Sequence, residues 1–199
     1  DKNDLAEWAY AIENATKVVG GKQDQYAAVL GGINFLKFNN SHQVTIERIK
    51  LRTDIKRKLE NRLFLDYTGP RMSSDINQSV VRNFLNKQKK TVDVFKEIIE
   101  NVKHMRHGLK NNDLEHFADC LNKEWALRKK LHPNVTTRKI EERIKFAMDN
   151  GASAAKVCGA GGGGSILFYA ENKKELIKKF HNKLIPFRFD NEGLRTWIK

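Results

Sequence analysis

Cysteine and proline are scarce in this sequence, whose 199 residues include two Cys, three Pro and 13 Gly. Two cysteines exclude a small domain held together by disulfides, and the low proline and glycine content excludes collagen-like or low-complexity sequence. The longest stretch without a charged residue, residues 157–170, is too short for a helix that crosses a bilayer. No basic and then apolar leader follows Asp1, so we expect a soluble cytoplasmic protein with no membrane partner.

Acidic residues are outnumbered by basic ones. Lys and Arg total 37 against 24 Asp and Glu, which gives a net charge of +13. Residues 1–40 contain four Lys and five acidic residues, so the whole excess lies on residues 41–199. A basic domain can attract nucleic acid, anionic lipid or phosphorylated metabolites. The basic residues are spread among acidic ones and are not interleaved with aromatic side chains, so the pattern favours a solvated surface over a specific nucleic-acid platform.

Apolar residues recur with two different periods, and 40% of the chain is hydrophobic, which is enough for a core. Helical spacing predicts helices over residues 4–17, 24–29, 76–85, 92–109, 114–125, 140–148 and 172–180. Short apolar or alternating runs predict strands near residues 33–38, 44–51, 63–65, 155–158, 166–169 and 184–189.

The order of these elements predicts the fold class. A strand, a run of helices, two strands, a helix and a strand indicate an α+β fold with helices on one face of a sheet. Asn112 and Glu115 have the spacing of a capping box at the start of the helix near residue 114. Residues 1–40 resemble the end of a different unit, so we expect one domain over residues 41–199 and a remnant of another before it.

Gly159-Ala160-Gly161-Gly162-Gly163-Gly164 is the most distinctive segment. Glycines let backbone N–H groups approach an anion and adopt positive φ. The run satisfies G-x-G-x-x-G, but a strand and not a helix follows it, which excludes the dinucleotide-binding fingerprint. No Gly-Lys-Ser/Thr closes it, so it is not a phosphate-binding P-loop either. A tight turn between strands rarely needs five glycines, so we favour a backbone-lined wall of a binding site.

Asp24 stands two residues after Lys22, close to a predicted helix N-terminus. From the spacing alone, a side chain that caps the helix is the better interpretation. The functional alternative is a base that accepts a proton from a hydroxyl, kept ionised by Lys22 and the helix dipole. His104 and His107 lie one helical turn apart, but no carboxylate or Cys clearly joins them, so we expect no metal site there.

Several segments together resemble the GHMP family of small-molecule kinases. The run Lys156-Val157-Cys158-Gly159 and the glycines after it is similar to the C-terminal motif of that family. Gly21-Lys22-Gln23-Asp24-Gln25-Tyr26-Ala27-Ala28, followed by Gly31-Gly32, resembles the sugar-kinase segment that holds the catalytic aspartate. Leu65-Asp66-Tyr67-Thr68-Gly69-Pro70-Arg71 is similar to the heptose 7-phosphate kinase branch, and Trp125 with the basic residues after it also fits that branch.

The resemblance implies a ferredoxin-like C-terminal domain and ATP- and Mg²⁺-dependent phosphorylation of the anomeric hydroxyl of D-glycero-D-manno-heptose 7-phosphate, for nucleotide-activated heptose and surface polysaccharide. Asp24 would be the catalytic residue that orients or deprotonates the hydroxyl. The implied substrate contacts are Lys22, Gln23, Arg71, Gly162 and Gly163, and Gly161 and Gly164 would lie near the nucleotide phosphates.

The family's N-terminal segment, with its loop for the ATP phosphates, has no counterpart in these 199 residues. We therefore expect the chain to be the C-terminal part of a kinase, to need the missing half as a partner, and to be inactive alone. Two other functions stay open: a different GHMP sugar 1-kinase, such as a fucose-type kinase, and a non-catalytic basic binding domain.

Overall fold

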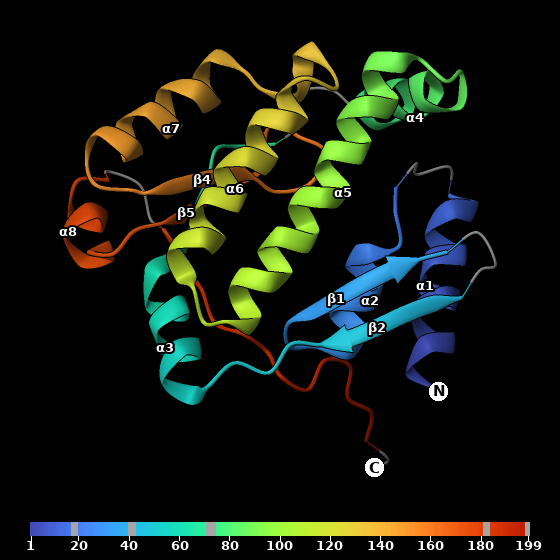
Figure 1. The fold of residues 1–199 in the computed structure, drawn as a ribbon, viewed down its shortest axis with the longest axis horizontal. Helices are drawn as coiled ribbons and strands as arrows, with labels where there is room; N and C mark the ends of the chain where they lie inside the picture. The colour runs from blue at the N-terminus through green and yellow to red at the C-terminus, as the bar shows by residue number, and fades with distance from the viewer. Residues whose placement is uncertain (17–19, 40–42, 71–74, 181–183, 198–199) are drawn as a thin grey trace. The chain divides into compact units, whose positions relative to one another are not determined.

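The computed structural model of the chain describes residues 1–16, 20–39, 43–70, 75–180 and 184–197, which form two compact units (Figure 1). One unit contains Asp1–Lys50 and the C-terminal segment from Arg188, and the other contains Leu51–Phe187. Each unit buries a hydrophobic cluster of its own.

The first unit packs two helices against a two-stranded hairpin. Its elements are α1 (Lys2–Ala15), α2 (Gln23–Leu30), β1 (Asn34–Phe38) and β2 (Val44–Arg48). The two strands pair antiparallel, with Leu36 opposite Ile46. Both of these side chains pack against the buried core of Ala6, Tyr26 and Val29. The two helices and the strand pair that the sequence pattern predicts are therefore confirmed, with ends shifted by at most three residues.

The C-terminal segment is hydrogen-bonded into this unit. Leu194 N–H donates to the Val29 carbonyl at 3.1 Å. Gly31 has φ of +61°, and a Cβ there would overlap the backbone of Gly193, so this close approach requires glycine. The hairpin also pairs residues on both sides of residue 40. The compact unit thus extends to Lys50, and the assignment of residues 1–40 to a preceding kinase domain stays a prediction.

The second unit is built around an antiparallel sheet in the order β4-β5-β3-β6. Its strands are β3 (Leu63–Tyr67), β4 (Ala154–Val157), β5 (Ser165–Tyr169) and β6 (Ile185–Pro186). Phe168 in the centre lies opposite Phe64 on one side and Ala155 on the other. This strand order, with helices after β3 and between β5 and β6, is the ferredoxin-like arrangement. The predicted α+β fold is therefore confirmed.

The helices of this unit are α3 (Thr53–Arg62), α4 (Ile76–Leu85), α5 (Lys89–Lys110), α6 (Leu114–Lys129), α7 (Arg138–Asp149) and α8 (Lys173–Lys178), with a 3₁₀ turn at Pro133–Val135. Helices α5 and α6 lie side by side as an antiparallel pair (Figure 1), joined by a 2.8 Å bond from Asn101 Nδ2 to the Cys120 carbonyl. The sequence pattern missed α3, because only Ile55 and Leu59 mark its apolar side.

Two expectations about element ends are wrong. Helix α6 is capped by Asp113, whose Oδ1 accepts from His116 N–H at 2.9 Å. Asn112 lies before the cap with φ of +59°, so the N-cap is one residue later than expected, and the residue three after it is His116 and not the Glu115 of the expected capping box. The last strand covers two residues instead of 184–189, and Pro186 lacks the N–H that would continue the ladder.

The core of the second unit joins the sheet to several helices. Phe64 and Phe168 stack with their rings 5.3 Å apart, and Phe180 meets both rings edge-on. Buried side chains of α4, α6, α7 and α8 complete this cluster. The outer strand β4 is covered by Asn122 of α6, whose amide donates to Ser153 O and accepts from Ala155 N–H. This amide satisfies backbone groups that an open sheet edge would expose.

Candidate functional site

Three predicted site residues lie in sequence at the start of α2. Lys22 precedes the helix, Gln23 is its first residue and Asp24 its second. The N-cap residue is Lys22, whose side chain makes no capping hydrogen bond, so the interpretation of Asp24 as a helix cap is wrong. The Asp24 side chain is exposed in the first turn, where the helix dipole favours negative charge. Within the described ranges, no hydrogen bond or ion pair engages its carboxylate.

Lys22 is bound to a different carboxylate. Its Nζ lies 2.6 Å from Glu7 Oε2 on α1 and 5.1 Å from the centre of the Tyr10 ring. The Tyr26 hydroxyl donates to the other oxygen of Glu7 at 2.7 Å. Burial raises the pKa of Tyr26 to about 12, and the hydrogen bond to Glu7 and its charge add to the shift. Lys22 is therefore not the partner of Asp24 that the sequence suggested.

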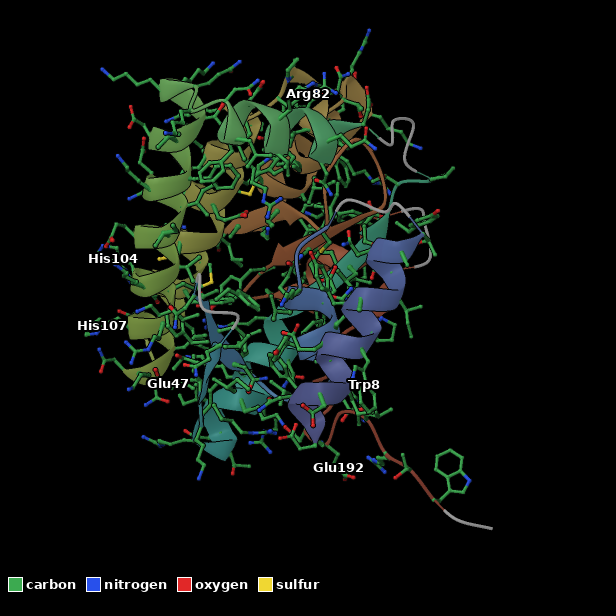
Figure 2. The ribbon with its side chains drawn as sticks, turned by 90° about the vertical axis from the view of Figure 1, so that its right-hand side faces the viewer. Trp8, Glu47, Arg82, His104, His107 and Glu192 are labelled. Carbon is green, nitrogen blue, oxygen red and sulfur yellow. The ribbon has the colours of Figure 1, made fainter. Side chains whose placement is uncertain are left out.

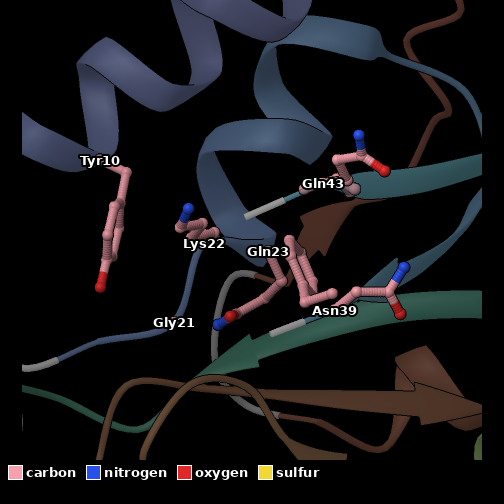
Figure 3. A pocket seen from close by; sticks show the side chains of 8 residues that line it. Tyr10, Gly21, Lys22, Gln23, Asn39 and Gln43 are labelled. Carbon is pink, nitrogen blue, oxygen red and sulfur yellow. The ribbon is translucent and has the colours of Figure 1, made fainter. Parts of the chain in front are cut away.

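A pocket of about 410 Å³ opens beside these residues (Figure 3). It is lined by Tyr10, Gly21, Lys22, Gln23, Phe38, Asn39, Gln43 and Val44. The amide side chains in this set can donate to and accept from hydroxyl groups, and the aromatic rings can cover an apolar face. One ammonium group completes a lining that suits a polar, hydroxyl-rich or anionic small molecule.

The glycine run in the second unit connects β4 to β5 and is anchored on two sides. Gly162 N–H donates to Val135 O at 2.8 Å, and Gly164 N–H donates to Gly69 O at 2.8 Å. Gly161 has φ of +91°, and a Cβ there would overlap the Val135 carbonyl oxygen. The glycine run is thus wedged between the 3₁₀ turn and the loop after β3. A simple hairpin turn between two strands would not require these contacts.

Only part of this backbone is used in hydrogen bonds within the described residues. The N–H groups of Gly162 and Gly164 are used inside the protein. Those of Gly161 and Gly163 have no acceptor among the residues that the structure describes. Both residues have positive φ, which requires glycine or strongly favours it. These two N–H groups are therefore the ones that could donate to an anion.

Cationic side chains flank the glycine run. Arg128 Nη1 lies 3.4 Å from Gly159 O, and its Nε donates to Glu124 at 2.6 Å. Lys156 of β4 contacts the same carboxylate at 2.7 Å. On the other side of the run, Lys139 Nζ donates to Thr68 O at 2.5 Å. Three of the basic residues of 41–199 thus lie around this loop, and two of them share the carboxylate of Glu124.

The structure brings Lys22, Gln23 and Asp24 together in the first unit, and Gly161–Gly164 together in the second. Arg71 falls outside the described residues. The sequence pattern missed Glu7 and Tyr10, which lie one helical turn apart on α1. The sequence does hold an indirect sign of this contact. Lys22 and Tyr26 are four residues apart at the start of α2, so their side chains face the same neighbour.

His104 and His107 project from one side of α5 and are exposed (Figure 2). The His104 ring lies 6.1 Å from that of His116, and His107 Nε2 is 2.8 Å from Asn111 Nδ2. In the described parts of the chain, no three His, Cys, Asp or Glu side chains are grouped to hold a metal ion. A search of the same residues finds no helix with the length and apolarity that a bilayer crossing requires.

Residues 105–185 match the family model described as the C-terminal domain of GHMP kinases. Over residues 105–185 the chain thus matches the C-terminal domain of this kinase family, as its motifs suggested. It is 31% identical over 201 residues to D-glycero-alpha-D-manno-heptose 7-phosphate kinase of Campylobacter jejuni, and the match covers 98% of the chain and 59% of that protein. The chain thus spans about three fifths of this relative.

Two further relatives bear on the substrate. A crystal structure of a D-glycero-D-manno-heptose 1-phosphate kinase from Bacteroides thetaiotaomicron superposes with a TM-score of 0.62 at 25% identity, over 97% of this chain and 55% of that one. The bifunctional fucokinase/GDP-fucose pyrophosphorylase of Arabidopsis thaliana is 26% identical over 88% of the chain and 17% of its own length. The resemblance to the heptose kinase branch is confirmed, and the fucokinase match is the weaker one.

Proposed function

We propose that the protein acts in ATP-dependent phosphorylation of the anomeric hydroxyl of a heptose 7-phosphate. The observation that carries this proposal is the carboxylate of Asp24, which is exposed, lies at a helix N-terminus and has no partner among the described residues. The motif around it resembles that of sugar kinases, and Lys22 and Gln23 beside it line a polar pocket. The relatives named above supply the substrate class.

The reaction needs little covalent chemistry from the protein. The anomeric oxygen attacks the terminal phosphorus of ATP, the new O–P bond forms, and the bond to the leaving ADP breaks. Asp24 accepts the proton that the hydroxyl loses, because no cation among the described residues competes for its carboxylate. The protein otherwise positions the two substrates and neutralises charge.

The remaining residues would hold the substrates. We assign Lys22, Gln23 and Arg71 to the sugar phosphate. Gly162 and Gly163 would let the sugar approach the backbone, and Gly161 and Gly164 would lie near the nucleotide phosphates. Among the glycines, Gly161 and Gly163 offer the N–H groups that can donate.

Magnesium would enter with the triphosphate and neutralise its charge, since Mg²⁺ is often held by phosphates, water and one or two carboxylates. The described residues contain no cluster of three ligands, so we assign it no ligand in this chain. The first unit would correspond to the end of a kinase N-terminal domain. Because the reaction consumes ATP, we place it in the cytoplasm, where its product would serve nucleotide-heptose and polysaccharide synthesis.

A substrate panel tests the proposal. The protein from the complete reading frame is incubated with ATP, Mg²⁺ and one of three acceptors: heptose 7-phosphate, the unphosphorylated heptose or L-fucose. We expect ADP formation with the first, and a new anomeric phosphate in the ³¹P NMR spectrum of the product. Preference for fucose would instead support the fucose-type alternative, and no turnover with any sugar would contradict the kinase assignment.

A further inference from the structure

The buried carboxylate of Glu124 has two cationic partners and not one. Its side chain is 7% exposed, and its two oxygens contact Arg128 Nε at 2.6 Å and Lys156 Nζ at 2.7 Å. The three residues join α6 to the edge strand β4 directly before the glycine run. A single carboxylate would be balanced by a single cation, so this group carries one positive charge in excess.

This excess charge is only partly exposed to water. The side chains of Arg128 and Lys156 are 35% and 22% exposed. Two cations this close to each other are costly in a partly desolvated place unless a second anion offsets them. Within the described residues Glu124 is the only carboxylate that the two cations contact. The arrangement therefore leaves a place for an anion that the chain itself does not supply.

The guanidinium of Arg128 is directed to the glycine run. Its Nε is used by Glu124, and its Nη1 reaches Gly159 O at 3.4 Å. Its Nη2 has no acceptor among the described residues, although each guanidinium nitrogen carries donors in a fixed plane. That plane matches the oxygens of a phosphate group. The free N–H groups of Gly161 and Gly163 follow within four residues of Gly159.

A purely structural role is the alternative. An ion pair network between α6 and β4 could serve only to hold the helix against the edge strand. Asn122 already makes that connection with two hydrogen bonds, at 2.8 Å to Ser153 O and 3.1 Å from Ala155 N–H. One cation would also have been enough to neutralise Glu124. The second cation is the feature that a structural role leaves unexplained.

We propose that Arg128 and Lys156 form a phosphate-binding subsite beside the glycine run, and that Glu124 is the positioning residue that orients both cations. This inference rests on the proposed function for the identity of the ligand. There the phosphate would be the 7-phosphate of the sugar or a phosphate of the nucleotide. Both sources present anionic phosphate oxygens, and the experiment distinguishes the two.

The first test is a titration of the ¹⁵N-labelled chain with inorganic phosphate, followed by NMR. We expect saturable shifts at the Arg128 Nε–H signal and at the amides of the glycine run. Arg128→Gln and Lys156→Met should each weaken binding about tenfold, because each removes a charge-assisted hydrogen bond. Arg128→Gln keeps a polar side chain that can still bond to Glu124, so one variant retains the local packing.

Arg138→Met is the matched control. Arg138 lies in the same unit, is 92% exposed and pairs with Glu142 on its own helix, so its loss should leave phosphate binding unchanged. Equal phosphate affinity in Arg128→Gln, Lys156→Met and Arg138→Met would overturn the subsite. Phosphate-induced chemical-shift changes that appear elsewhere but not near Arg128 and the glycine run would also overturn it.

Kinetics of the protein from the complete reading frame identify the source of the phosphate. If it belongs to the sugar, Arg128→Gln raises KM for heptose 7-phosphate about tenfold and leaves KM for ATP unchanged. The reverse pattern assigns the subsite to the nucleotide, and no change in either KM contradicts the inference. The phosphate titration needs no turnover, so a binding subsite in a protein that phosphorylates no sugar would overturn the proposed function alone.

Discussion

The ammonium group of Lys22 lies 2.6 Å from Glu7 Oε2, although the carboxylate of Asp24 is only two residues away in sequence. The Tyr26 hydroxyl holds the other oxygen of Glu7 at 2.7 Å. Glu7 thus fixes Lys22 to α1 and leaves Asp24 without a cationic partner among the described residues. Under the proposed function, this contact separates Lys22, which we assign to the substrate, from Asp24, which we assign to accept the proton.

The pKa of Tyr26 reports on this contact. It is raised from 10.0 to about 12, first by burial and then by the hydrogen bond to Glu7 and its charge. In Glu7→Gln we expect the pKa to fall but to stay above its ordinary value, because burial remains. The difference in phenolate absorbance between each protein and its Tyr26→Phe version isolates this one phenol during an alkaline titration. An unchanged pKa in Glu7→Gln would contradict the contact.

The same shift predicts a pH dependence of stability. A raised pKa in the folded state means that the folded protein keeps the phenol proton more tightly than the unfolded chain does. The contribution of Tyr26 to stability is therefore complete below pH 10 and is lost as the pH rises toward 12. The free energies of unfolding of the wild type and of Tyr26→Phe, measured in urea, should therefore differ less at the upper end of this pH range than at neutral pH.

Gly161 should tolerate no side chain. Its φ is +91°, and a Cβ would overlap the Val135 carbonyl oxygen. Gly151 is a matched control, since its φ is +107° but a Cβ there meets nothing within 4 Å. We expect Gly151→Ala to lower the free energy of unfolding by about 1–2 kcal/mol, and Gly161→Ala by roughly a further 2 kcal/mol. Equal losses in urea unfolding would show that the run is not wedged against Val135.

Buried Asp66 and partly exposed Arg143 form an ion pair in the second unit. Arg143 Nε lies 2.5 Å from Asp66 Oδ2, and the Asp66 side chain is 1% exposed. Arg143→Met should cost about 3–4 kcal/mol of unfolding free energy, because it leaves a buried carboxylate unpaired. Adding Asp66→Asn should recover at least about 1 kcal/mol of this loss. Arg138→Met, at an exposed pair, should cost about 0.5 kcal/mol or less, and a similar cost for Arg143→Met would contradict the account.

Periodicity predicted the amphipathic elements well and the charged ones poorly. The long helices α5 and α6 follow from apolar spacing, because each buries one side against the core, and the strands β3 and β5 follow from short continuous apolar runs that are buried on both faces. Helix α3 was missed, since Ile55 and Leu59 are too few to raise a signal above its charged residues. The cap at Asp113 differs from the expected Asn112 because Asn112 adopts a left-handed conformation, which sequence spacing does not reveal.

The candidate site was predictable only where its residues are consecutive. Lys22, Gln23 and Asp24 share one short segment, so a motif identifies them together. The partner of Lys22 is Glu7, fifteen residues away on another helix, and no local pattern identifies such a contact. The glycine run was recognised from composition, but which of its N–H groups are free depends on Val135 and Gly69. Arg71 lies outside the described residues, and its role stays a prediction.

The central claim is that Asp24 accepts the proton during phosphoryl transfer, and kcat of Asp24→Asn with heptose 7-phosphate tests it most directly. Asp54→Asn is the control, because Asp54 holds the same second position of an exposed helix, α3, and pairs with Arg52. In the protein from the complete reading frame, we expect Asp24→Asn to lower kcat by about 10²–10⁴-fold and Asp54→Asn to leave it unchanged. Turnover by Asp24→Asn at the rate of Asp54→Asn would contradict the account.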